Sequence, residues 1–293
     1  MTTSLAVPAD RVARGILFAV LSFGCFSATD ATVKWLSADY SVFQIMLFSC
    51  LFAFLPVGAF VAGNGGLTAI RPKHPRMAWL RGCLVTGSAL CILSALTTLP
   101  MSEGYAIVFS GPLIVTVLSV PLLGEAVGRH RWAAVAVGFA GVLIMLRPGF
   151  QAVETGHLLA LASAILFAAS LIVLRRLGRD ENGSALLVVL LASTILVVAP
   201  VVPAIWRLPA PGDFGLMLLA GLTSGLAHIF LVLAFREAPA AIVSPFQYTQ
   251  MVWAVIFGLW LFGDRPDPVT FSGATVVIAS GLYILWRETR SRR

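Results

Sequence analysis

The fold of this chain is decided by the stretch GILFAVLS, Gly15 to Ser22, which returns 141 residues later as GHLLALAS, Gly156 to Ser163. The match continues beyond these eight positions, because Phe26 recurs at the same shift as Phe167. Two distant segments of one chain are therefore similar, and the simplest explanation is an internal repeat. The alternative is chance similarity between two apolar segments of low complexity.

The repeat extends along the chain with a shift of 139 residues. LLGE at 122–125 corresponds to LFGD at 261–264, and Pro100 corresponds to Pro239. Proline and Gly-acid matches at one constant shift argue against chance. We therefore expect two halves, residues 1–149 and 150–293. Further matches at this shift join Leu80, Gly82 and Ala95 to Leu219, Gly221 and Ala234.

The composition shows which solvent surrounds the repeats. Of the 293 residues, 59% are hydrophobic and 11% are charged, whereas soluble domains are about 45–50% apolar and about 25% charged. Too few polar residues remain to coat a core of this size, so the solvent is lipid. This excludes a soluble enzyme, a nucleic-acid binder and a disordered chain. Continuous apolar runs also disfavour a transmembrane β-barrel.

Ten segments reach the length of about 20 apolar residues that crosses a bilayer. The sequence therefore predicts an all-α membrane protein with five helices in each half. The first segment follows Arg11 and Arg14, but it is longer than the apolar part of a signal peptide, so we interpret it as a retained helix. The ten segments are 13–35, 41–62, 77–98, 101–123, 130–147, 155–177, 184–206, 214–236, 240–262 and 268–287.

The basic residues predict the orientation. Sixteen lie on the side that holds both termini, and four lie on the other side, at Lys34, Arg147, Arg207 and Arg265. The positive-inside rule places both termini in the cytoplasm. Since each half has an odd number of helices, the second half is expected to be inverted relative to the first. The sixteen are Arg11, Arg14, Arg71, Lys73, Arg76, Arg81, Arg129, Arg131, Arg175, Arg176, Arg179, Arg236, Arg287, Arg290, Arg292 and Arg293.

Motifs of enzymes and pumps are missing from the sequence. It contains no GxxxxGK[ST] and no HExxH, so neither an ATP-driven pump nor a zinc hydrolase is supported. The four cysteines lie in apolar segments without a CxxC pair, which disfavours disulfides and zinc sites. We therefore expect no cofactor, no metal and no catalytic residues. Inverted repeats of this kind are typical of secondary transporters.

The residues at the end of each half resemble the drug/metabolite transporter superfamily, in its EamA-type branch. The first half has Gly124 and Glu125 before a glycine-containing helix, and the second has Gly263 and Asp264, where the family usually has Glu. The stretch SPFQYTQMVW at 244–253 and the lysine Lys34 also resemble that branch. The resemblance implies a carrier of small metabolites, often an exporter, that works by alternating access without ATP. It also implies a cavity lined by helices one, three, four, six, eight and nine.

Polar residues inside the first helix are candidates for the transport pathway, because polar groups in lipid are costly. Ser27, Asp30 and Lys34 share one face, and Asp30 and Lys34 are four residues apart and able to pair. The functional interpretation is a coupling or gating ion pair. The alternative is a pair that reaches for the membrane surface.

The eighth and ninth helices supply further candidates. Ser224 and His228 share a face of the eighth with two glycines, so His228 either lines the cavity and binds a carboxylate or serves packing. The ninth carries amides, a phenol and an aromatic ring that suit an amphipathic solute, although hydrogen bonds between helices explain them too. These residues are Ser244, Gln247, Tyr248, Gln250 and Trp253.

The fourth helix carries a weaker candidate face with Tyr105 and Pro112. Pro112 is expected to kink this helix because proline lacks the backbone N–H. Pro245 is expected to act similarly in the ninth helix. The Gly-Glu and Gly-Asp pairs at 124–125 and 263–264 are expected to cap helices rather than to contact substrate.

These observations predict a monomeric transporter in a bacterial-type inner membrane that moves a small amphipathic metabolite. An amino acid, in particular an aromatic one, is the preferred substrate, and the protein acts as an exporter or facilitator. A proton-coupled exporter of drugs or toxic metabolites is the alternative within this class. A channel-like membrane protein is the alternative outside it. The expected partners are the solute and the lipid bilayer, with no nucleic acid.

Overall fold

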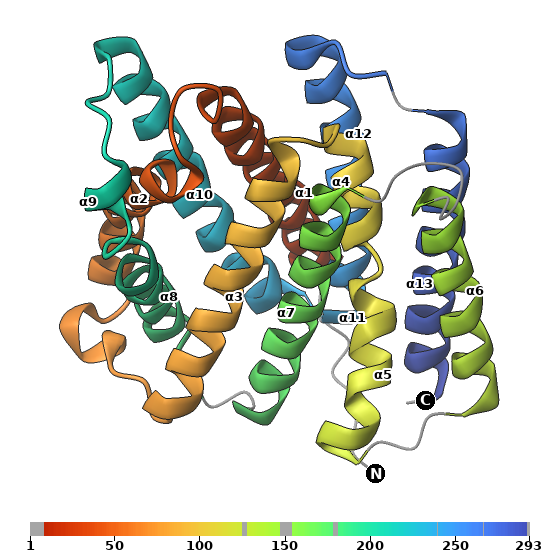
Figure 1. Ribbon diagram of the computed structural model, residues 1–293. Helices are drawn as coiled ribbons and strands as arrows, with labels where there is room; N and C mark the ends of the chain where they lie inside the picture. The colour runs from red at the N-terminus through yellow and green to blue at the C-terminus, as the bar shows by residue number, and fades with distance from the viewer. Residues whose placement is uncertain are drawn as a thin grey trace.

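The computed structural model describes residues 9–124, 128–146, 154–177, 181–238, 240–265 and 267–291, and every regular element within these ranges is helical (Figure 1). Glu125 and the boundary at 149/150 between the predicted halves lie outside these ranges. The elements are α1 (Ala9–Leu36), α2 (Val42–Gly63), η1 (Gly66–Ile70), α3 (Pro75–Leu96), α4 (Met101–Val108), α5 (Gly111–Leu123), α6 (Arg129–Leu146), α7 (Thr155–Leu177), α8 (Gly183–Val198), α9 (Val202–Ile205), α10 (Pro211–Glu237), α11 (Ala240–Val243), η2 (Ser244–Tyr248), α12 (Thr249–Phe257), η3 (Gly258–Phe262) and α13 (Pro268–Ser291).

Six helical stretches within the described ranges are long and apolar enough to cross a membrane. They are α1, α2, α3, α7, α10 and the combined stretch Met101–Leu123 of α4 and α5. Shorter apolar helices occupy Trp132–Met145, Gly183–Val198 and Pro268–Ile284. For the described ranges the prediction of an all-helical membrane protein is therefore confirmed, and the count of ten membrane helices stays a prediction.

The outer surface of the bundle is apolar, and small polar residues lie inside it. On α1, Leu17 and Leu21 are exposed, whereas Ser22 and Ser27 are fully buried. This distribution is the reverse of that in a soluble helix, because lipid solvates the leucines and only protein can satisfy a hydroxyl. Ser22 Oγ accordingly donates a 2.8 Å hydrogen bond to the Ala227 carbonyl.

Prolines interrupt two of the predicted helices. The predicted fourth helix is divided at Phe109 and Ser110, and Pro112 stands in the first turn of α5, so the expected interruption is confirmed. Pro245 lies within the 3₁₀ turn η2, which separates α11 from α12. The missing N–H of each proline explains both breaks.

The predicted seventh helix differs from the structure. It was expected to run to residue 206, but α8 ends at Val198, and the short helix α9 follows after a turn. Pro203 stands in the first turn of α9. Pro200, two residues after Val198, and Pro203 are the signals that could have located this break, but the prediction rested only on the length of the apolar run.

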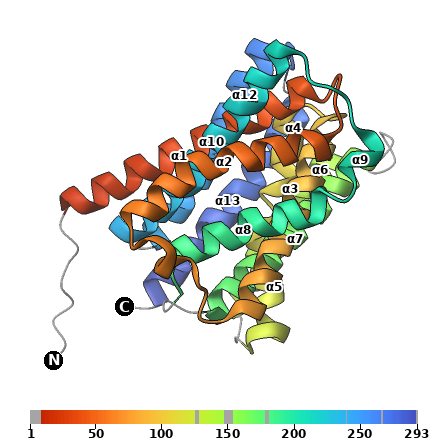
Figure 2. The same cartoon turned by 90° about the vertical axis from the view of Figure 1, so that its left-hand side faces the viewer.

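The helices pack mainly with partners far away in the sequence. α1 runs along α10, α3 runs along α7, and α6 and α13 form a pair at one edge (Figure 1). α2 lies between α10 and α8 (Figure 2). Consecutive long helices are antiparallel, so α1, α3 and η3 finish at one end of the bundle, here called the Lys34 end. α1 begins and α13 finishes at the opposite end, here called the Arg11 end (Figure 2).

Close contacts of glycines occur in related positions. A Cβ at Gly15 in α1 would lie 2.5 Å from the methyl group of Ala238, and a Cβ at Gly156 in α7 would lie 2.8 Å from Cγ of Leu99. Gly156 follows Gly15 by 141 positions, and Ala238 follows Leu99 by 139. The two contacts therefore join residues that correspond in the internal repeat, with the halves exchanged.

The hydroxyl contacts of the same helices also join residues that correspond in the internal repeat. Ser22 in α1 bonds to the carbonyl of Ala227 in α10, while Ser163 in α7 bonds to Ser88 in α3, with 2.9 Å between the two Oγ atoms. Ser163 corresponds to Ser22, and Ala227 corresponds to Ser88. Hydroxyl bonds of this kind hold membrane helices together where no hydrophobic effect is available.

Candidate functional site

Three polar side chains meet inside the bundle. The Tyr105 hydroxyl of α4 donates a hydrogen bond to Oδ2 of Asp30 in α1, and Nε2 of Gln250 in α12 donates to the Tyr105 oxygen over 3.1 Å. Tyr105 is buried, whereas Asp30 and Gln250 are partly exposed. The structure thus brings together three of the predicted site residues, from helices on both sides of residue 150.

Lys34 forms a second polar contact at the Lys34 end. Its Nζ lies 3.0 Å from Oδ2 of Asp264, which follows η3, and 3.0 Å from the carbonyl of Leu99. The Met101 N–H donates to the same carboxylate over 3.3 Å. The two charged side chains are only 13% and 19% exposed, so solvent screens them less than it screens a surface pair. The contact ties α1 to the turns before α4 and after η3.

Two predictions about these charges need correction. The spacing of Asp30 and Lys34 suggested that they pair with each other, but Asp30 bonds to Tyr105 and Lys34 pairs with Asp264. Asp264 was expected only to cap a helix. Gly263 does end η3 with a positive φ of 67°, as glycine readily permits, but the Asp264 carboxylate holds Lys34. Spacing within one helix reports local neighbours and cannot reveal a partner 230 residues away.

His228 of α10 lies deeper in the bundle. Its Nδ1 is 2.8 Å from the Ser224 carbonyl, and since a carbonyl only accepts, Nδ1 carries the proton of this bond. Its ring packs edge-on against Phe26 of α1, with 4.8 Å between the centroids. The backbone bond fixes the ring and leaves Nε2 for another partner. Ser224 therefore contributes its carbonyl rather than its hydroxyl to this contact.

Arg81 of α3 is a further candidate that was not identified from the sequence, where it was counted among the topology charges. The side chain is partly buried. Its buried Nε has no hydrogen-bond partner among the described residues. Arg81 stands six residues into α3, about 9 Å from the helix start at 1.5 Å per residue. That depth is the signal that could have distinguished it from the arginines in loops.

The remaining ninth-helix residues are divided by the turn η2. Tyr248 is buried and packs edge-on against Phe109, with centroids 5.3 Å apart, and its hydroxyl lies against Gly281 of α13. Trp253 lies against Gly24 of α1 and stacks on Phe257. Gln247 is partly exposed, and the side chain of Ser244 lies outside the described part of the structure. The predicted continuous stripe is therefore not formed, because 3₁₀ geometry changes the register.

A second pairing across the bundle was also missed. His157 Nε2 of α7 lies 3.0 Å from Oε1 of Glu103 in α4, and the Glu154 N–H donates to His157 Nδ1. Since Nδ1 accepts, Nε2 carries the hydrogen that reaches the carboxylate. This contact lies at the Lys34 end, where α4 and α7 begin. Glu103 and His157 are each near a helix start, where polar residues are common, and neither was identified as a candidate from the sequence.

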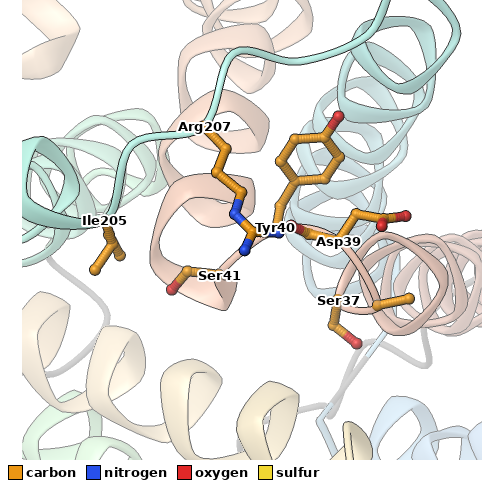
Figure 3. A pocket seen from close by; sticks show the side chains of 7 residues that line it. Ser37, Asp39, Tyr40, Ser41, Ile205 and Arg207 are labelled. Carbon is orange, nitrogen blue, oxygen red and sulfur yellow. Dashed lines mark hydrogen bonds between the residues drawn. The ribbon is translucent and has the colours of Figure 1, made fainter.

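A pocket of about 380 Å³ opens at the surface of the Lys34 end (Figure 3). Arg207 spans it and donates to the Asp39 carbonyl over 2.9 Å, while its backbone N–H bonds to Gln44. The cluster of Asp30, Tyr105 and Gln250 does not line this pocket. We therefore place the candidate site at the buried polar groups rather than in this surface hollow, whose lining residues are Ser37, Ala38, Asp39, Tyr40, Ser41, Ile205 and Arg207.

No metal centre is visible in the described ranges, where no three His, Cys, Asp or Glu side chains gather as ligands would. All four cysteines are free thiols.

Known proteins resemble this chain over nearly its full length. It is 30% identical to a riboflavin transporter of Rhizobium johnstonii, over 99% of this chain and 97% of that protein. It is 28% identical to an S-adenosylmethionine uptake transporter of Rickettsia conorii, over 94% of each chain. It is 26% identical to a pseudopaline exporter of Pseudomonas aeruginosa, over 92% of this chain and 95% of that one.

One solved crystal structure shares the fold, with a TM-score of 0.65 at 17% identity over 96% of this chain and 99% of the other. The model of the EamA-like transporter family matches residues 13–147 and again residues 154–286. The family match confirms the resemblance seen in the sequence, and the three relatives above are transporters rather than enzymes. The chain is a multi-pass membrane transporter that belongs to the EamA-like transporter family.

Proposed function

We propose that this protein is a secondary transporter that moves a small amphipathic metabolite, with an amino acid as the preferred substrate, by alternating access. It works as an exporter or facilitator in a bacterial-type inner membrane, as a monomer. The observation that carries the proposal is the cluster of Asp30, Tyr105 and Gln250. It places hydrogen-bonding groups and an acid between helices α1, α4 and α12.

The proposed topology has ten membrane crossings in two inverted halves, residues 1–149 and 150–293, with both termini in the cytoplasm. The double match of the family model and the corresponding contacts at Gly15 and Gly156 support the two halves. The distribution of the basic residues supports the orientation. In this orientation the Lys34 end faces the outside of the cell, and the Arg11 end faces the cytoplasm.

The proposed pathway runs along the inner face of α1. Lys34 and Asp264 form its outer gate, the cluster around Tyr105 lies one turn deeper, and His228 lies one turn deeper still. Residues four apart on a helix are separated by about 6 Å along the axis, so these three levels follow one another closely. Ser224 positions His228, Trp253 and Gln247 flank the pathway, and Pro112 allows the bend between α4 and α5.

The relatives do not select one solute, since their names give riboflavin, S-adenosylmethionine and pseudopaline as what they carry. The preference for an amino acid rests on the residues of this chain. A tyrosine hydroxyl, an amide and a carboxylate suit the polar end of such a solute. Aromatic rings at Phe26, Phe109 and Trp253 suit an apolar body.

The experiment that tests this function is counterflow in liposomes containing the purified protein. Labelled L-tryptophan, L-phenylalanine, riboflavin and S-adenosylmethionine form the panel. We expect saturable uptake that accelerates when the same unlabelled solute is trapped inside, because a carrier alternates between its two faces. Flux that never saturates and shows no counterflow would indicate a channel-like protein instead.

A proton-coupled exporter of drugs or toxic metabolites is the second candidate. The Asp30 carboxylate favours it, since an acid inside a membrane helix with no cation bonded to it in the described structure is costly, and binding a proton lowers that cost. An imposed pH gradient separates the two candidates. Uptake that follows the gradient in the parent protein, and ignores it in Asp30→Asn, would identify coupling rather than facilitation.

A further inference from the structure

His157 holds two different groups at the start of α7. Its Nδ1 accepts a 3.0 Å hydrogen bond from the N–H of Glu154, which immediately precedes the helix, and its Nε2 donates over 3.0 Å to Oε1 of Glu103. A side chain at the third helical position that bonds to the N–H before the helix forms half of a capping box, where Glu or Gln usually stands. The ring has to be neutral for both bonds to form, because a protonated ring has no acceptor.

The bond to Glu103 crosses between the two proposed halves of the protein. α4 belongs to the first half and α7 to the second, and both begin at the Lys34 end. Lys34 and Asp264 join the same two halves at the same end. A movement that opens this end by separating the halves therefore has to break both contacts. Of the two, only the contact at His157 contains a group that changes charge near neutral pH.

The opposite end lacks an equivalent of this contact. In the internal repeat, His157 corresponds to Ile16 at the shift of 141, and Glu103 corresponds to Ile242 at the shift of 139. Two isoleucines cannot form such a bond. A proton at His157 therefore acts on one end of the bundle and has no counterpart at the other.

The charged groups around His157 determine how the contact responds to a proton. Glu103 lies against Nε2, Glu154 stands before the helix, and the positive end of the α7 dipole opposes a charge on the ring. The helices packed against α7 are α3, α4 and α5. Their titratable residues are Glu103 and Tyr105 of α4 and Arg76, Arg81, Cys83 and Cys91 of α3, with none on α5. Both arginines stand in the first two turns of α3, at the Arg11 end, so Glu103 is the charge in contact with the ring.

Protonation of His157 exchanges one bond for a stronger one. A proton on Nδ1 removes the acceptor for the Glu154 N–H, but Glu154 is exposed, so water can replace that acceptor. The same proton turns the contact with Glu103 into an ion pair, and charge-assisted hydrogen bonds are roughly twice as strong as neutral ones. The side chains of His157 and Glu103 are only 10% and 19% exposed, so solvent screens this pair weakly. The gain between the halves therefore exceeds the loss at the helix cap.

We infer that His157 and Glu103 form a proton-sensitive lock at the Lys34 end. A proton on His157 tightens the connection between α4 and α7, holds this end closed and slows transport. The inference rests on the proposed function, because the lock regulates the same transport cycle. In the proposed orientation the lock responds to acid outside the cell. It differs from proton coupling at Asp30, which would respond to a pH gradient.

Counterflow with equal pH on both sides of the liposome membrane tests the lock, because no pH gradient then drives transport. The labelled probes are L-tryptophan, L-phenylalanine, riboflavin and S-adenosylmethionine. For each solute that is carried, we expect the rate at about pH 5.5 to be about fivefold or more below the rate at about pH 7.5. His157→Gln should remove this difference, because glutamine can make both bonds of the neutral ring and does not take up a proton.

Two further variants complete the set. Glu103→Gln keeps an acceptor for Nε2 but removes the charge, so its rates in acid and at neutral pH should be similar. His130→Gln changes an exposed histidine at the start of α6, at the Arg11 end, and is the control. It should keep the pH dependence of the parent protein.

The ring nitrogens of His157 report the lock without any solute. In protein labelled with nitrogen-15 histidine, the NMR signals of His157 are those missing from His157→Gln. We expect a proton on Nε2 alone at about pH 7.5 and protons on both nitrogens at about pH 5.5. A proton on Nδ1 at the higher pH, or ring signals that do not change between the two, would overturn the lock.

The outcomes separate the lock from the proposed function. Counterflow with the same pH dependence in the parent protein and in His157→Gln would overturn the lock and leave a transporter. Counterflow of none of the four solutes at either pH would overturn the proposed function itself, and the ring signals of His157 would then decide whether the lock forms.

Discussion

Lys34 Nζ lies 3.0 Å from Asp264 Oδ2 and joins the last turn of α1 to the residue after the cap of η3. The two residues are 230 positions apart, so this ion pair connects the beginning of the chain with its end. Lys34 Nζ also donates to the Leu99 carbonyl, and the Asp264 carboxylate also accepts from the Met101 N–H. Three segments therefore meet at one partly buried charge pair, and a conformational change that opens this end has to separate them.

The ion pair predicts non-additive substitutions. Lys34→Ala and Asp264→Ala should each slow transport, and the double variant should be less impaired than the sum of the two by about 1 kcal/mol, because either change already breaks the pair. Transport rates in liposomes measure this coupling. Arg265→Ala changes an exposed neighbouring charge and should leave the rate unchanged. Strict additivity of Lys34→Ala and Asp264→Ala would show that the pair does not act as a unit.

Tyr105→Phe tests the hydroxyl at the centre of the polar cluster. The change removes the donor to Asp30 and the acceptor for Gln250 while keeping the ring that stacks on Phe109. We expect transport to fall about tenfold or more with the protein still folded, since a hydrogen bond to a charged group contributes about 1.5–3 kcal/mol. Tyr283→Phe on the exposed face of α13 is the control, and equal activity of the two variants would contradict the prediction.

Tyr248 is expected to matter through packing. The sequence alone predicts that Tyr248→Ala lowers transport without lowering expression, but the ring is buried against Phe109 and Gly281. Its removal leaves a cavity, so we expect a loss of about 3–5 kcal/mol in folding stability. Thermal unfolding in detergent measures this loss. Tyr248→Phe keeps the ring and should remain near the parent melting temperature. An unchanged melting temperature in Tyr248→Ala would show that packing of the ring does not stabilise the fold.

Gly221→Ala should separate α10 from α2. A Cβ there would meet the Phe52 Cβ and lie 2.6 Å from the Ser49 carbonyl oxygen, which is backbone and cannot rotate away. We expect destabilisation of about 1–3 kcal/mol, measured as a lower melting temperature. Gly58→Ala in α2 has nothing within 4 Å of the new methyl group and should be neutral or slightly stabilising. If both substitutions changed the melting temperature equally, helix propensity rather than steric contact would determine their effect on stability.

The sequence predicted most of the helices because composition and length are local properties. Apolar runs marked the membrane segments, and Pro112 and Pro245 marked two breaks, since a missing N–H acts within its own helix. The end of α8 at Val198 was missed although Pro200 follows it, because the prediction rested on the apolar residues on both sides of that proline. Length and apolarity show where a helix is possible, but they do not show where it stops.

The candidate site was only partly predictable for a different reason. Asp30, Tyr105 and Gln250 were each identified from their polarity, yet their meeting depends on packing between three helices. Lys34 was assigned the nearest carboxylate in its own helix and instead bonds to one from the far end of the chain. Arg81 was missed because a charge a few residues inside a helix looks like a topology signal until its depth is known.

The contact between α1 and α10 has a consequence for biosynthesis. Ser22 finds its hydrogen-bond partner in Ala227, 205 residues later in the chain. At a translation rate of about 5–20 residues per second, the first helix waits on the order of 10–40 s for that partner. During this time the glycine face of α1 around Gly15 remains uncovered, and insertion machinery or lipid has to occupy it. Assembly of this bundle therefore finishes late, with the arrival of α10, and variants at Gly15 or Ser22 should be recognised by quality control as incompletely assembled chains.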